Sequence, residues 1–145
     1  MFGIIKHPWL SKGTCMTLSN SLIDRPRVLR TFSPPLTQFG LSRFSEIAEA
    51  AKTLNHPHLV PLYDFGISAE GTAYLVRERQ EGVKFTKLMR TSRKMEEALV
   101  IAIFTQVCEA LEHAVGEGVS CGDLSPDNIY IVDAGSTSPF VRIVG

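Results

Sequence analysis

The sequence lacks a long uninterrupted run of apolar residues, and this absence limits the classes of protein that it fits. The longest such run is Ala98–Phe104, whereas a helix needs about 20 apolar residues to cross a bilayer. Residues 1–13 hold no apolar stretch followed by a small-residue cleavage site, so no signal peptide is expected. We therefore predict no membrane insertion within this segment.

Excess charge and paired cysteines are also absent. The 15 Lys and Arg residues balance 15 Asp and Glu residues, so nothing points to nucleic acid or to an anionic membrane surface. The three cysteines, Cys15, Cys108 and Cys121, include no C-x-x-C pair. This favours reduced thiols and a cytoplasmic location over disulfides or a zinc site. Cys108 is expected to be a small core residue.

The hydrophobic periodicity predicts an alternation of strands and helices within one domain. Apolar residues recur at helical spacing over 41–54, including Ile47, and Asn55-His56-Pro57 is a stop signal. A second, largely buried helix is predicted over 95–115. It carries two adjacent apolar stripes, one of them with Ile101, Phe104, Cys108, Leu111 and Val115. Strands are predicted over 26–32, 59–65, 72–78, 129–132 and 140–144, with a short helix over 84–89.

Between the second helix and the strand 129–132 lies the segment most informative about function, Cys121–Val132. Pro126 disfavours helix at Ser125, so the segment begins as a loop. Asp123 and Asn128 are five residues apart on it. A carboxylate can take the proton of an attacking hydroxyl, and an amide oxygen can hold a magnesium ion, so the pair suits phosphoryl transfer. The alternative is an ordinary turn, since Asp, Ser, Pro and Asn are common turn formers.

Several segments in order resemble a eukaryotic-type protein kinase, closest to the bacterial Ser/Thr kinases. The D-L-x-P-D-N spacing is similar to the kinase catalytic loop. Asn55–Leu62 resembles the turn from helix C into the fourth strand, and Tyr74–Glu78 resembles the fifth strand leading into the hinge. The resemblance covers residues 26–145. Asp64-Phe65-Gly66 spells D-F-G but precedes the catalytic loop, so it is interpreted as the end of a strand and its turn.

The resemblance implies an α+β, two-lobe fold truncated after the catalytic loop and the following β-hairpin. Residues 1–80 would form the N-lobe and hinge, and 81–145 the start of the C-lobe. It also implies Asp123 as the catalytic base, Asn128 as the magnesium ligand, and a nucleotide-binding set. That set is Arg30, Glu78, Gln80, Ser125 and Asn128, with ATP and Mg²⁺ as cofactors if nucleotide binding is retained.

Several kinase positions carry unusual residues here. Arg30 takes the place of the phosphate-contacting lysine, unless it is simply a solvated strand residue. Ile47 takes the place of the helix-C glutamate, and Arg77 that of the apolar gatekeeper. Gly122 replaces the arginine of His-Arg-Asp, Ser125 replaces a lysine, and Tyr130 a smaller residue under the base. The metal-binding Asp falls at Gly145 or just after it, and of the glycine-rich loop only Gly13, with Leu10, is matched.

These departures lead to three hypotheses. The first is a catalytically impaired pseudokinase that acts as a protein-binding or regulatory module. The second is an active ATP-dependent Ser/Thr protein kinase, which needs an acidic residue after Val144. The third is a small-molecule phosphotransferase, to whose loop Gly122-Asp123-Leu124 is also similar. Since a kinase domain is much longer than 145 residues, we expect a fragment, a truncated gene model or part of a larger protein. We also expect it to expose a cut face where the rest of the C-lobe should pack.

Overall fold

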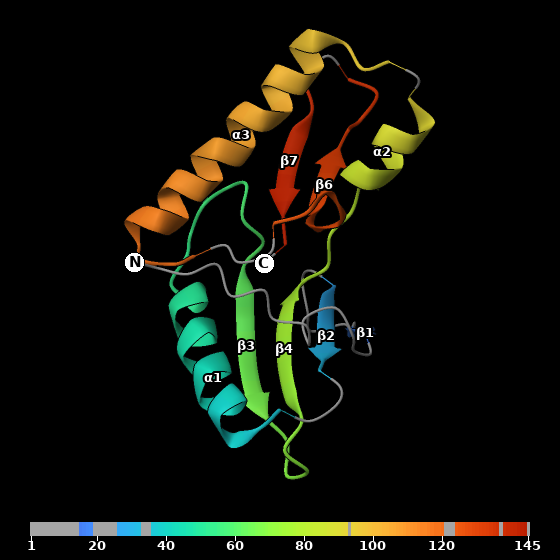
Figure 1. The fold of residues 1–145 in the computed structure, drawn as a ribbon. Helices are drawn as coiled ribbons and strands as arrows, with labels where there is room; N and C mark the ends of the chain where they lie inside the picture. Colours follow the sequence, from blue (N-terminus) through green and yellow to red (C-terminus); the bar gives the residue numbers. More distant parts are fainter. Residues whose placement is uncertain are drawn as a thin grey trace. The chain divides into compact units, whose positions relative to one another are not determined.

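The computed structural model describes residues 15–18, 26–32, 36–92, 94–120, 124–136 and 138–144. The chain divides into two compact units, each described here by itself. The four-stranded unit comprises the described residues up to 54 together with 61–79. The three-stranded unit comprises residues 55–60 and those from 80 onward. Figure 1 shows the elements of both.

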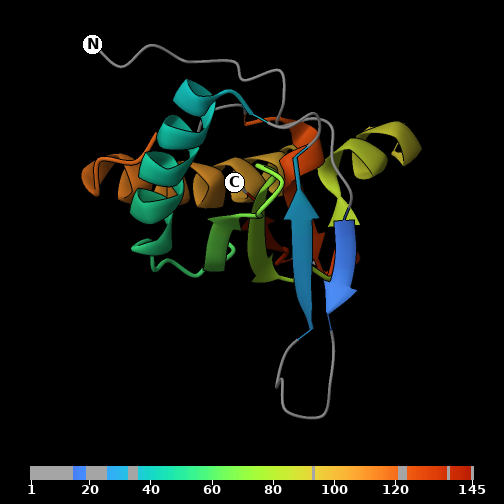
Figure 2. The same ribbon diagram turned by 90° about the horizontal axis from the view of Figure 1, so that it is seen from below.

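The four-stranded unit is an antiparallel sheet covered by one helix. Its strands lie in the order β1-β2-β4-β3, and β1 and β2 are the neighbouring blue arrows of Figure 2. Their bounds are β1 Cys15–Leu18, β2 Arg27–Thr31, β3 Leu62–Ile67 and β4 Ala73–Glu78. The strands predicted over 26–32, 59–65 and 72–78 are thus confirmed to within three residues. Asp64-Phe65-Gly66 lies inside β3, so the strand interpretation is right, but the turn comes later.

Helix α1, Gln38–Lys52, begins three residues before the predicted helix. Thr37 caps it, because its hydroxyl accepts the Gly40 N–H at 3.2 Å. Phe44 of α1 packs edge-to-face on Phe32 and Phe65, with ring centroids 5.5 and 6.2 Å apart. The prediction that Ile47 belongs to the buried stripe is wrong, since Ile47 is 43% exposed. The contacts to the sheet are made through Phe44 and the buried Ala48 instead.

The three-stranded unit pairs a small antiparallel sheet with two helices. The strands lie in the order β5-β6-β7, with bounds β5 Val83–Lys84, β6 Ile129–Val132 and β7 Phe140–Ile143. Helix α2 spans Phe85–Thr91, helix α3 spans Glu97–Gly116, and the 3₁₀ turn η2 spans Pro126–Asn128. The predicted helices and both predicted strands of this part are confirmed, but the prediction that the helix over 95–115 is largely buried is wrong, since most residues of α3 are exposed or half-buried. Strand β5 and η2 were not predicted.

Helix α3 packs one of its two apolar stripes against the sheet beside β7 (Figure 1). The buried stripe contains Ile103, Val107, Ala110 and Ala114, each at most 3% exposed. In the other stripe Ile101, Phe104 and Val115 are 57%, 46% and 69% exposed. Cys108 is exposed as well, so its predicted core position is wrong. A helix with two apolar stripes buries only the one that meets a partner, and the single sheet covers one face.

Helix α3 is also the one described helix that is long and apolar enough to cross a membrane by length and composition alone. The core helix of a folded domain passes the same test. Here α3 carries fully buried residues against the sheet, and its Gln106 is hydrogen-bonded to β7. These contacts pack one face of α3 against the sheet, and 22% of its 18-residue apolar window is buried within the described structure.

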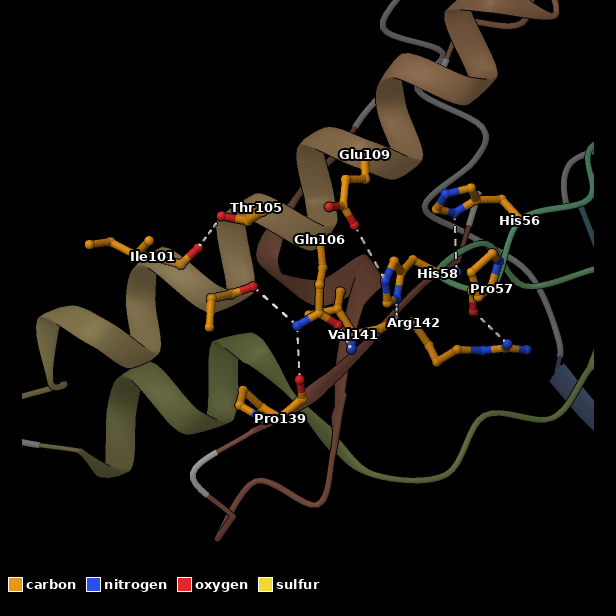
Figure 3. Close-up of polar contacts among 11 residues, drawn as sticks. His56, Pro57, His58, Ile101, Thr105, Gln106, Glu109, Pro139, Val141 and Arg142 are labelled. Carbon is orange, nitrogen blue, oxygen red and sulfur yellow. Dashed lines mark hydrogen bonds and ion pairs between the residues drawn. The ribbon is translucent and has the colours of Figure 1, made fainter.

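Strand β7 lies at the edge of its sheet, yet its outer backbone groups are hydrogen-bonded (Figure 3). The side chain of Gln106 donates to the Pro139 carbonyl at 2.8 Å and accepts the Val141 N–H at 2.9 Å. His58 Nδ1 donates to the Val141 carbonyl at 2.9 Å. The Ile143 N–H donates to the His58 carbonyl, and the Val60 N–H donates to the Ile143 carbonyl. Helix α3 and residues 55–60 thus supply the hydrogen bonds that a further strand would otherwise supply to the outer edge of β7.

The two stripes of α3 provide a matched test of this packing. We expect Ile103→Ala to lower the free energy of unfolding by about 2–5 kcal/mol, because it leaves a cavity in the core. We expect Ile101→Ala, on the same helix, to change it by about 0.5 kcal/mol or less. The change in helix propensity is the same in both, so it cancels in the comparison. Urea denaturation followed by circular dichroism measures both, and equal losses would contradict the assigned faces.

Candidate functional site

The predicted site residues are divided between the two units. Arg30 and Glu78 belong to the four-stranded unit, and Gln80, Ser125 and Asn128 belong to the three-stranded unit. The predicted catalytic base Asp123 lies outside the described residues. Cys121, Gly122, Gly145 and the remnant of the glycine-rich loop, Gly13 and Leu10, lie outside them too.

The described part of the predicted catalytic loop is a tight, well-bonded turn. Ser125 is extended, with φ −133° and ψ 160°, as expected before a proline, and Pro126 opens η2. The Asn128 N–H donates to the Ser125 carbonyl at 2.9 Å, and the Asn128 carbonyl accepts the Val144 N–H at 2.8 Å. This backbone bonding fixes Asn128 at the point where the loop enters β6.

Asp127, the acidic neighbour of Asn128, accepts a hydrogen bond that joins the loop to a helix. The Thr86 hydroxyl of α2 donates to Asp127 Oδ1 at 2.8 Å. Asp127 therefore anchors η2 to α2. No group of three or more His, Cys, Asp or Glu residues able to hold a metal ion occurs among the described residues. Within the part of the loop that the structure describes, Asn128 remains the residue whose chemistry suits magnesium.

Arg30 lies on the face of the four-stranded sheet that meets α1. Val28, Arg30 and Phe32 alternate toward the same side, and Phe32 contacts Phe44 of α1. Val28 and Phe32 are buried, and the Arg30 guanidinium lies 5.3 Å from the centroid of the Phe32 ring. Arg30 is half-buried rather than fully solvated. In the described part of the chain, no carboxylate forms an ion pair with it.

Helix α1 carries carboxylates, but they serve other contacts or face solvent. Glu46 Oε2 lies 3.8 Å from Arg43 Nη1 on the same helix, and both side chains are largely exposed. Glu49 is exposed. Ile47, the residue at the kinase glutamate position, presents an exposed hydrocarbon. An ion pair between β2 and α1 therefore does not form through any of these three described residues.

Arg77 lies on the same sheet face as Arg30, because it pairs with the buried Val28 across the β2–β4 ladder. Arg77 Nη1 donates to the Glu78 carbonyl at 3.4 Å. The carboxylate of Glu78 points to the opposite face, where it accepts the Tyr63 hydroxyl at 3.2 Å. The guanidinium of Arg27 stacks 4.4 Å from the Tyr63 ring centroid. Both the carbonyl and the carboxylate of Glu78 thus have protein partners.

In the three-stranded unit, Gln80 is tied to β7. Arg142 Nε donates to Gln80 Oε1 at 3.2 Å, and Arg142 Nη1 donates to the Pro57 carbonyl at 2.8 Å. Tyr130 and Lys84 lie on the same sheet face as Arg142, with Lys84 Nζ 6.0 Å from the Tyr130 ring centroid. The amide nitrogen of Gln80 is buried and has no hydrogen-bond partner among the described residues. A donor in that state suits an acceptor on a bound ligand.

Each unit by itself has one feature that suits a nucleotide. Gln80 offers a buried donor in the three-stranded unit, and Arg30 offers a positive charge in the four-stranded unit. Arg77, in contrast, stands where the resemblance implies an apolar residue, and Asn128 is the described residue that the resemblance assigns to the ion. ATP and Mg²⁺ binding by this chain stays a prediction.

Sequence reasoning missed the polar contacts around residues 56–58. His58 is buried between β7 and Glu109 of α3, and Arg142 reaches the Pro57 carbonyl (Figure 3). His58 and Val141 are 83 residues apart in sequence, so no local pattern could have revealed the contact. A concavity of about 440 Å³ on the four-stranded unit, lined by Leu29, Thr31, Ser68, Glu70, Thr72 and Tyr74, includes none of the predicted site residues.

Comparison with known proteins places the chain among protein kinases. The protein kinase domain family matches residues 37–144. The serine/threonine-protein kinase pkn3 of Myxococcus xanthus is 32% identical over 104 residues, which are 72% of this chain and 19% of that protein. Pkn1 of the same organism is 30% identical over 114 residues, 79% of this chain and 15% of that protein.

Solved structures show the same fold. The PknI kinase domain of Mycobacterium tuberculosis matches with a TM-score of 0.74 at 23% identity, over 91% of this chain and 53% of that chain. Rad53 residues 1–466, solved in complex with AMP-PNP, match with a TM-score of 0.71 at 21% identity, over 91% and 34%. The chain thus spans about half of the PknI kinase domain and less than a fifth of the two Myxococcus relatives. It belongs to the protein kinase domain family, with the predicted α+β kinase fold over about half of such a domain.

Proposed function

We propose that this chain is a protein-kinase-like domain with impaired phosphotransfer that acts in the cytoplasm as a protein-binding or regulatory module. The four-stranded unit then corresponds to the N-lobe with its hinge, and residues from 81 onward to the start of the C-lobe. Retained kinase folds can lose their chemistry, because function resides in the site rather than in the fold. Other proteins are the proposed partners.

One observation carries the proposal. A kinase positions its phosphate-contacting lysine through an ion pair with a helix glutamate. Here Arg30 on β2 stacks on Phe32, and the helix offers the hydrocarbon of Ile47. Arginine keeps the positive charge but carries it on a longer, planar fork, and an isoleucine cannot orient it. Phosphates would be attracted to this sheet face without being held in a reactive position.

A specific observation favours the second candidate, an active ATP-dependent Ser/Thr kinase. Asn128 is held by backbone hydrogen bonds on both sides, as a magnesium ligand must be. Asp123 precedes it at the kinase spacing, and Arg30 would then contact phosphates. The relatives matched are serine/threonine-protein kinases, so we do not propose the small-molecule phosphotransferase.

Nucleotide binding separates the two candidates. With 1 mM ATP and excess Mg²⁺, we expect the melting temperature to differ by less than about 1 °C from that with Mg²⁺ alone. A ligand at a tenth of its dissociation constant stabilises by less than about 0.1 kcal/mol, whereas one at a hundredfold excess stabilises by about 2.7 kcal/mol. Differential scanning fluorimetry measures the shift. Magnesium-dependent stabilisation, together with phosphate transfer that Asp123→Ala abolishes, would establish the active kinase instead.

Restoring the ion pair tests the observation that carries the proposal. We expect Arg30→Lys with Ile47→Glu to gain Mg-ATP stabilisation of several degrees, because the resemblance places the paired lysine and glutamate of a kinase at these two positions. Ile47 is 43% exposed, so the helix should tolerate the new carboxylate. Arg30→Lys with Ile47→Gln is the matched control, nearly the same shape without the charge. If the control gains as much as the glutamate variant, the missing pair is not the cause.

A further inference from the structure

Three of the four histidines of the chain form one column of neighbouring, mutually tilted rings in the three-stranded unit. The His113 ring of α3 lies 5.2 Å from the His56 ring, and His56 lies 5.4 Å from His58. The His58 ring lies 4.7 Å from Phe140 of β7. The column joins residues 55–60 to both α3 and β7. These residues connect α1 to β3 along the chain.

Hydrogen bonds determine which ring nitrogens carry protons. A carbonyl oxygen only accepts, so His58 Nδ1 must donate its proton to the Val141 carbonyl. The backbone N–H of His58 donates to His56 Nδ1 at 3.2 Å, so that nitrogen carries a lone pair. His56 is therefore neutral, with its proton on Nε2, in the docked state, in which residues 55–60 lie on β7 and α3. Figure 3 shows both contacts.

A second proton has opposite consequences at the two residues. His58 Nε2 lies 3.8 Å from Glu109 Oε2, so protonated His58 gains an ion pair. A proton on His56 Nδ1 would instead face the His58 N–H and break their hydrogen bond. It would also add positive charge beside His58 and His113, whose Nε2 is buried with no hydrogen-bond partner among the described residues.

Among the described residues, the Glu109 carboxylate of α3 opposes that charge, and Arg142 of β7 binds the intervening Pro57 carbonyl. Burial, followed by the charges of His58 and His113, lowers the pKa of His56 from 6.5, and Glu109 opposes this in part. A lowered pKa in the docked state means that docking is fully stabilised above pH 6.5 and is weakened as the pH falls below it.

We propose that His56 is a proton-sensitive latch, which in its neutral form holds residues 55–60 on β7 and α3 and on protonation releases them. Release removes the Val60–Ile143 and Ile143–His58 backbone hydrogen bonds and exposes the outer edge of β7. This property is independent of phosphotransfer, so it stands whether or not the proposed impairment is correct.

Hydrogen exchange measured by mass spectrometry tests the latch directly. Exchange is compared at pH 7.5 and pH 5.5 after correction for the intrinsic rates. We expect protection of the Val60 and Ile143 amides to fall several-fold at pH 5.5. The β4 amides of residues 73–78 serve as the internal reference and should keep their protection. Equal protection of Val60 and Ile143 at both pH values would overturn the proposal.

Two variants separate the effect of protonating His56 from the effect of its packing and hydrogen bonding. His56→Asn keeps an oxygen that accepts the N–H two residues on but has no titrating group, so it should keep Val60 and Ile143 protected at both pH values. His7→Asn, outside the described residues, should retain the full pH dependence. If His56→Asn retains that dependence, the latch is disproved. Should His56→Asn fail to fold, NMR of the unsubstituted chain decides at pH 7.5: a proton on His56 Nδ1 would disprove the latch, and a bare Nδ1 supports it.

Discussion

Strand β7 has a partner strand on one side only, and the groups that complete its other side hold the three-stranded unit together. A buried backbone N–H or carbonyl without a partner costs about 1–3 kcal/mol, so the outer edge of a covered strand must be satisfied. Gln106 of α3 hydrogen-bonds the Pro139 carbonyl and the Val141 N–H. Residues 58–60 hydrogen-bond the Val141 carbonyl and both backbone groups of Ile143. Helix and loop are therefore fixed on β7 by directional bonds as well as by apolar contact.

The same strand fixes the predicted catalytic loop. The Val144 N–H, just beyond β7, donates to the carbonyl of Asn128, and β6 begins at the next residue and pairs with β7 along its length. On its other side η2 is bonded to α2 through Thr86 and Asp127. A change that loosens β7 should therefore disturb Asn128, although neither Gln106 nor His58 lies near it in the sequence. The loop geometry thus depends on the outer edge of β7, whereas β6, which follows the loop, pairs with the inner edge.

Local patterns in the sequence predicted most of the elements, because each amphipathic helix and short strand carries its own period. They could not choose between the two apolar stripes of α3, since the choice depends on which partner is present; Cys108 and Ile101 were therefore misplaced. Local patterns also could not predict contacts between residues that are far apart in the sequence, such as His58 and Val141. In the candidate site, the motif spacing predicts Asn128 as a magnesium ligand, and that role stays a prediction. The contact of Arg30 with Phe32 and the exposure of Ile47 could not be predicted, because they depend on the packing of α1 on the sheet.

The charges on one face of the four-stranded sheet bear on the proposed impairment of phosphotransfer. Arg30 and Arg77 both occupy the sheet face that meets α1, and the described ion pairs of α1 are made by Glu46 with Arg43 and by Lys52 with Asp64 of β3. The fold tolerates these arginines because stacking and a carbonyl partner stabilise them. Arg30 has no ion-pair carboxylate among the described residues. A cation that is not oriented attracts phosphate without aligning it, and alignment supplies most of the catalysis in phosphoryl transfer. Stability of the sheet is thus compatible with the proposed impairment of phosphotransfer, because a kinase fold alone does not imply an active kinase.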